Sequence, residues 1–149
     1  MRKSKGFTLI ELLIVMAVIA ILIAIAIPSF RGMQNEARKT KAQGDLRVLK
    51  VAVESYYKNN NNVYPVEASY QTTLLAASPR ILETNLYDPF GATSTTDYVY
   101  DTDTGVQATA KYYILYSIGP ETTAGTAVVN TAGTVTASNG AIWESNGHL

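Results

Sequence analysis

A single acid inside an apolar stretch is the first feature of this sequence that indicates a chemical role. The stretch begins with Gly6 and Phe7, runs to Ile27, and contains one charged residue, Glu11. A charged side chain deep in a bilayer costs roughly 2.5–3.5 kcal/mol. A helix N-terminus gains only about 0.3–1 kcal/mol from such an acid. We therefore expect Glu11 to meet a positive charge, and the N-terminus of a neighbouring copy is our candidate.

A second acidic group lies in the turn from Asp101 to Gly105. Asp101 and Asp103 alternate in it and could supply oxygen ligands to calcium, but no distal acid follows that could bind with both oxygens. Calcium takes about six to eight oxygen ligands. We therefore expect a plain connection between two strands, with calcium binding as the weaker alternative.

The sequence offers few residues for catalysis or for binding a soft metal ion. The chain has no cysteine and one histidine, His148, which excludes Cys-rich zinc, thiol and iron–sulfur sites. No Ser-His-Asp order and no ligand spacing indicates a catalytic centre. We expect a protein that is not an enzyme and needs no cofactor, calcium aside.

The net charge is zero, but the charges are unevenly distributed. Residues 31–58 carry seven basic and three acidic residues, whereas residues 59–149 carry two basic and eight acidic residues. This pattern allows two interpretations: a solvated helix face, or attraction between the basic stalk of one copy and the acidic head of the next. The dispersed basic residues do not resemble a nucleic-acid site.

The apolar stretch has the length of a membrane span. Residues 7–27 form a run of 21 residues, which as a helix extends over about 32 Å, close to the thickness of a bilayer core. Arg2, Lys3 and Lys5 precede it and favour a cytoplasmic N-terminus. The remainder would then lie outside the inner membrane.

Helical periodicity continues beyond the span. Pro28 should kink or locally interrupt the helix. An apolar stripe follows at steps of three and four residues, and the run Asn59–Asn62 is a credible stop. We predict one long, interrupted helix from about Phe7 to Lys58. The stripe consists of Phe30, Met33, Ala37, Ala42, Leu46, Leu49, Val53 and Tyr56.

The second half of the chain changes to short strands. A short helix is expected within Glu67–Ala77 and a turn at Asp88–Gly91. Tyrosine and β-branched residues then predict strands, separated by Gly, Asn and Thr. The fold class is α+β: a small antiparallel sheet packed on the C-terminal half of the long helix. The expected strands are Asp97–Asp101, Lys111–Ile118, Ala127–Val129, Thr134–Ala137 and Ala141–Trp143.

The N-terminal segment resembles that of type IV pilins and type II secretion pseudopilins. Residues 5–11 read Lys-Gly-Phe-Thr-Leu-Ile-Glu, and Pro28 stands at the family's usual place. The resemblance implies a prepilin peptidase that cuts between Gly6 and Phe7 and methylates the new amine of Phe7. It also implies assembly through Phe7, Glu11 and Pro28 into a filament of identical subunits, with an inner-membrane assembly platform and minor pilins or pseudopilins as partners.

Two other interpretations of the N-terminus remain open. Ala24-Ile25-Ala26 fits the cleavage site of an ordinary secretory signal peptide, which would release a soluble domain. Against it, Glu11 would have no reason to lie in the apolar region, and the helical pattern continues past that cut. A plain single-span anchor explains neither Gly6-Phe7 nor Glu11.

Later motifs resemble the major pseudopilin of type II secretion. They are Asp88-Pro89-Phe90-Gly91 and Ser117-Ile118-Gly119. Members of that branch commonly bind calcium in an acidic loop, but here the corresponding loop, Pro120–Gly133, has Glu121 as its only acid. A major type IV pilin of a surface fibre, for adhesion, motility or electron transfer, is the alternative.

The resemblance also implies a domain division and a location. A leader (1–6) would precede a transmembrane and filament-core helix (7–30). A head (31–149) would follow, including the amphipathic half-helix 31–58. We expect a single-pass protein of a bacterial inner membrane, with its head in the periplasm before the filament forms there or at the cell surface.

Overall fold

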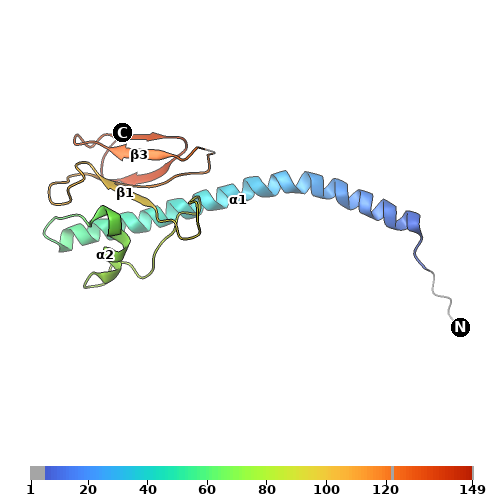
Figure 1. The fold of residues 1–149 in the computed structure, drawn as a ribbon, viewed down its shortest axis with the longest axis horizontal. Coiled ribbons are helices and arrows are strands. Elements are labelled where there is room, and N and C mark those ends of the chain that lie inside the picture. The colour runs from blue at the N-terminus through green and yellow to red at the C-terminus, as the bar shows by residue number, and fades with distance from the viewer. Residues whose placement is uncertain (1–5, 122, 149) are drawn as a thin grey trace. The chain divides into compact units, whose positions relative to one another are not determined.

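The computed structural model describes residues 6–121 and 123–148, and the basic residues of the expected leader lie outside this range. The chain divides into two compact units, Met1–Glu36 and Ala37–Leu149. The first described unit is helical, and the second combines helix and sheet, which confirms the α+β class. Figure 1 shows the elements in order: α1 (Leu9–Asn59), a short 3-10 helix (Glu67–Ser69), α2 (Tyr70–Ala76), β1 (Val99–Thr102), β2 (Tyr113–Ser117), β3 (Thr126–Val129), β4 (Val135–Ser138) and β5 (Ile142–Ser145).

Helix α1 is continuous, so the predicted interruption at Pro28 was wrong. The helix runs through Pro28 without a break. Proline removes only the hydrogen bond that its own amide would donate, and the turns on both sides keep theirs.

Both ends of α1 follow local capping chemistry. The helix begins at Leu9, not at Phe7, because Thr8 caps it. At the other end, Asn61 and Asn62 adopt left-handed backbone conformations with φ of 52° and 59°. Asparagine tolerates this conformation better than most residues, which confirms the predicted stop directly after the helix.

The predicted stripe on α1 is buried only in its later part. Phe30 and Met33 are 64% and 67% exposed. The buried positions start at Ala42 and belong to the main core of the head. They are Ala42, Leu46, Leu49, Ala52 and Val53.

The head contains two antiparallel sheets rather than the one that was predicted. The larger sheet has the order β1-β2-β5, and the smaller one pairs β3 with β4 (Figure 1). Tyr113 and Leu115 of β2 face α1 in the main core. Ile114, which points the opposite way, packs on the β3–β4 pair with Ala127. This alternation makes three layers: helix α1, the three-stranded sheet and the two-stranded sheet.

Candidate functional site

The start of α1 places Thr8 and Glu11 in direct contact. The amide of Glu11 donates to Thr8 Oγ1 at 3.3 Å, and the Thr8 hydroxyl lies 3.5 Å from Glu11 Oε2. Thr8 thus caps the helix with the Thr-x-x-Glu spacing of a capping box, but the Glu11 carboxylate contacts the Thr8 hydroxyl rather than the Thr8 amide. Glu11 therefore has a local role in its own helix, and its exposed carboxylate still has room for a further partner.

The apolar segment that follows is exposed along its whole length. Phe7 is 80% exposed, Leu9 is 89% exposed, and every described residue from Gly6 to Arg38 is exposed. The helix is long and apolar enough to cross a membrane. A monomeric soluble protein rarely leaves so large an apolar surface uncovered, so a bilayer or other copies must cover it.

In the head, the structure brings together two motifs that lie 29 residues apart. Asp88 is 3% exposed. Its Oδ1 accepts from Ser117 Oγ at 2.7 Å and from the Phe90 amide at 2.9 Å, and its Oδ2 accepts from the Ile118 amide at 3.0 Å. The predicted turn is confirmed by the bond from the Gly91 amide to the Asp88 carbonyl at 3.0 Å. Asp88 thus locks this turn to the end of β2.

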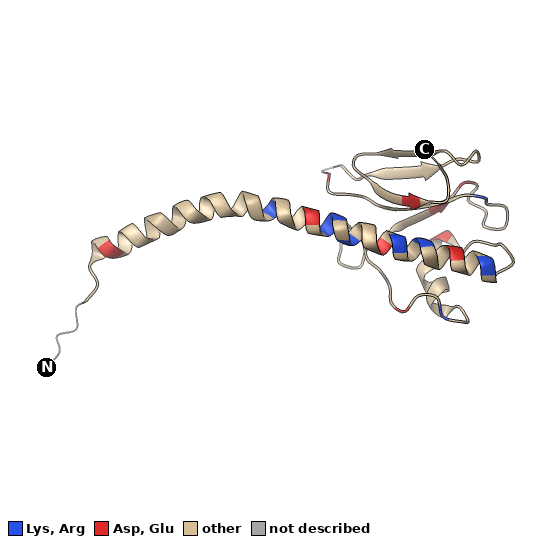
Figure 2. Cartoon of the chain, turned by 180° about the vertical axis from the view of Figure 1, so that it is seen from behind, with Lys and Arg blue, Asp and Glu red and all other residues tan. Residues whose placement is uncertain are grey.

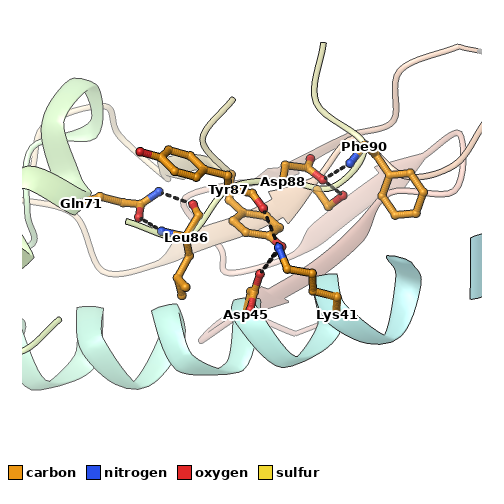
Figure 3. A network of polar contacts seen from close by, with 9 residues as sticks. Lys41, Asp45, Gln71, Leu86, Tyr87, Asp88 and Phe90 are labelled. Carbon is orange, nitrogen blue, oxygen red and sulfur yellow. Dashed lines mark hydrogen bonds and ion pairs between the residues drawn. The ribbon is translucent and has the colours of Figure 1, made fainter. Parts of the chain in front are cut away.

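Two further side chains hold the same loop (Figure 3). Gln71 on α2 is buried, and its amide group pairs with the backbone of Leu86 on both sides, at 2.8 Å and 2.7 Å. Lys41 on α1 donates to the Tyr87 carbonyl at 3.4 Å and lies 3.4 Å from the carboxylate of Asp45. The loop is therefore fixed to α1, α2 and β2 at once. No sequence pattern pointed to Gln71, because its role depends on the distant backbone that it meets.

Acids on α1 also meet tyrosines of the sheet. The Tyr98 hydroxyl donates to Asp45 at 2.9 Å, and the Tyr113 hydroxyl donates to Glu54 at 3.0 Å. Burial, reinforced by the neighbouring carboxylate, raises the pKa of each of these two tyrosines. Acidic and basic residues alternate along the later part of α1 (Figure 2), and two of these acids, Asp45 and Glu54, help to join the helix to the sheet.

Comparison with known proteins identifies the N-terminal segment. A protein-family model described as "Prokaryotic N-terminal methylation motif" matches residues 1–27. This chain carries the prepilin N-terminal methylation motif. Gly6, Phe7 and Glu11 lie inside the matched range, and Pro28 follows it directly.

Relatives named as pilins and a relative named as a secretion protein match part of this chain. A "Fimbrial protein" of Pseudomonas aeruginosa is 49% identical over 55 residues, which is 37% of this chain and 36% of that protein. The "Type II secretion system core protein G" of Vibrio cholerae serotype O1 is 38% identical over 65 residues, 44% of each chain. The "Type IV major pilin protein PilA" of Myxococcus xanthus is 42% identical over 59 residues, 40% of this chain and 27% of the relative.

The family model ends at residue 27, before the head begins. The chain covers less than half of the length of these relatives, whose names include both pilins and a secretion protein. No solved structure matches the chain. None of the three relatives is named as an enzyme.

Asp101 and Asp103, the weak candidates for calcium, each accept a hydrogen bond from the backbone. Asp101 Oδ1 accepts from the Thr102 amide at 2.8 Å, and Asp103 Oδ1 accepts from the Lys111 amide at 3.1 Å. Burial and the nearby Glu67 raise the pKa of Asp101, against the stabilising Thr102 amide. Within residues 6–121 and 123–148, no three His, Cys, Asp or Glu side chains are grouped as metal ligands. The two aspartates stabilise the turn by binding its backbone.

Proposed function

We propose that this chain is the structural subunit of a type IV pilus-like filament. A prepilin peptidase would cleave it between Gly6 and Phe7 and methylate the new amine. The observation that carries the proposal is the exposed apolar helix joined directly to the prepilin motif. Before assembly the bilayer covers this helix, and afterwards the helices of neighbouring subunits do.

Glu11 would direct the register of assembly. After cleavage, the amine of Phe7 carries a positive charge at neutral pH, and Glu11 lies four residues further along the chain, in the first turn of α1. If neighbouring subunits are offset along the filament axis, the carboxylate of one can pair with the amine of the next. In a medium of low dielectric constant, such pairing recovers part of the energy that both charges lost on leaving water.

We propose the major pseudopilin of a type II secretion system as the specific identity. This assignment is supported by the lock between Asp88 and Ser117, because it joins the two head motifs that resemble that branch. A major type IV pilin of a surface fibre is the alternative, supported by the fimbrial relatives. The inner-membrane anchor, periplasmic head, assembly platform and minor subunits belong to the same proposal.

The test uses Glu11 and a matched control. Glu11→Ala removes the charge, whereas Thr8→Ala removes only the cap, which costs about 1 kcal/mol in a helix. We expect Glu11→Ala to be inserted and cleaved but to give few filaments, Thr8→Ala to give more, and Glu11→Asp to be intermediate because its reach is shorter. Filaments are counted in sheared cell fractions, and the mass of the N-terminal peptide reports cleavage.

Two results would contradict the proposal. A mature chain that starts at Ile27 would mean secretion by an ordinary signal peptide. Normal filament yield from cleaved Glu11→Ala subunits would mean that apolar packing alone drives assembly. Fibres sheared from the cell surface would favour the pilin alternative over the pseudopilin, once mass spectrometry has identified their subunit.

A further inference from the structure

The head leaves a second apolar stripe of α1 uncovered. Val48 and Val51 are 51% and 66% exposed, and they follow helical spacing with Ala52 and Ser55. Together with the segment after α2 they line an open groove of about 530 Å³. The groove is lined by Arg47, Val48, Val51, Ala52, Ser55, Pro79, Arg80 and Ile81.

Two arginines give this groove a positive charge. Arg47 is 75% exposed and only loosely paired, with its Nε 3.9 Å from Glu144. Arg80 donates to the Leu75 carbonyl at 3.3 Å, and no carboxylate of the described chain lies within ion-pair distance of it. The groove therefore suits a partner that offers an apolar side chain next to an acid.

The connection between β1 and β2 has this chemistry. Val106 is 53% exposed in a loop that also carries Asp103. The carbonyl of Val106 accepts from the amides of Thr109 and Ala110, each at 3.0 Å. The Thr104 hydroxyl also donates to that carbonyl at 3.1 Å. These bonds hold Val106 in a fixed exposed position, so docking it would cost little conformational entropy.

We propose that the loop 103–107 of one copy docks into this groove of a second copy. Val106 contacts Val48 and Val51, and Asp103 faces Arg80. The two surfaces differ, so each subunit offers one of each, and repeated contacts of this kind build an open filament when the rotation between copies does not close into a ring. The inference rests on the proposed filament function and assigns the contact between heads, separate from the N-terminal helices.

Cysteine cross-linking tests the contact in the full-length chain, which has no cysteine of its own. Cells co-express a Val51→Cys subunit with a Val106→Cys subunit, and a mild oxidant is added. A disulfide requires two Cα atoms within about 7 Å. The matched control replaces Val106→Cys with Val128→Cys, because Val128 is also 53% exposed but lies on β3.

We expect mixed dimers from the Val51–Val106 pair, several-fold more abundant than from the Val51–Val128 control. Equal yields from both pairs, or none from the first, would overturn the contact. Filaments of the unsubstituted chain are counted separately. Filaments without the Val51–Val106 cross-link refute the docking alone, whereas an unsubstituted chain that forms no filaments refutes the proposed function.

A charge exchange supplies an independent measurement. Arg80→Glu should reduce filament yield several-fold, and Asp103→Arg in the same chain should restore much of it. Failure of the second substitution to restore any yield would contradict the pairing of Asp103 with Arg80, provided that both variants accumulate to the level of the unsubstituted chain.

Discussion

Removal of the Asp88 carboxylate should destabilise the head more than removal of any exposed acid. Asp88→Ala takes away the acceptor for Ser117 Oγ and for the amides of Phe90 and Ile118. Ser117 is fully buried, so its hydroxyl would lose its acceptor without gaining water and keep only the bond from the Gly119 amide.

The magnitude follows from these three hydrogen bonds. A hydrogen bond to a charged group contributes roughly 1.5–3 kcal/mol. Ile118 and Phe90 are only half-buried, so water offsets part of their loss. We expect Asp88→Ala to lower the free energy of unfolding by about 4 kcal/mol in total, a large part of the 5–15 kcal/mol that is typical of domains. Asp88→Asn should lower the free energy of unfolding by about 2 kcal/mol, because the side-chain NH2 of asparagine would face the Ile118 amide, which is also a donor.

Urea unfolding of the full chain in detergent measures this effect. The single tryptophan, Trp143, packs in the second core cluster of the head and reports unfolding by fluorescence. With a slope of about 2 kcal/mol per molar urea, Asp88→Ala should shift the midpoint by about 2 M. The control is Asp97→Ala, which removes an exposed acid with one bond, from Gln71 at 3.1 Å. Equal shifts for the two variants would refute the role assigned to Asp88.

Three further predictions concern the head. Tyr100→Phe should raise the free energy of unfolding by about 1 kcal/mol in urea titrations, because the buried hydroxyl of Tyr100 has no hydrogen-bond partner within the described chain. Tyr113→Phe should lower the free energy of unfolding by a similar amount, because the hydrogen bond from Tyr113 to Glu54 on α1 is lost. Burial, above all, raises the pKa of Tyr64 from 10.0 to about 12; the folded state therefore keeps a proton that the unfolded state releases, and the urea midpoint should fall as the pH rises from 10 to 12, to which the other buried tyrosines also contribute. A chelator or added calcium should leave the melting temperature of the head unchanged. A shift in that temperature that Asp101→Asn or Asp103→Asn abolishes would instead show that the head binds calcium.

The prepilin segment could be predicted from sequence because its chemistry is local. Gly6, Phe7 and Glu11 are neighbours in the chain, and the apolar run needs no partner to be recognised as a span. The later half-helix was also predictable, since the stripe from Ala42 to Val53 repeats at helical spacing. These features depend on periodicity and adjacency, which a sequence contains directly.

The arrangement of the head was decided by tertiary contacts. The order β1-β2-β5, with β3 and β4 in a second sheet, depends on which strands pair with β2. Asp88 had been assigned to a turn, and its burial against Ser117 needs a contact between residues 29 positions apart. Gln71 gave no signal at all, because its importance lies in the backbone of Leu86 that it satisfies. The sequence of this protein determines which segments are apolar and must be buried. Which distant groups bury them depends on how polar groups such as Asp88 and Gln71 find hydrogen-bond partners in a core of low dielectric constant.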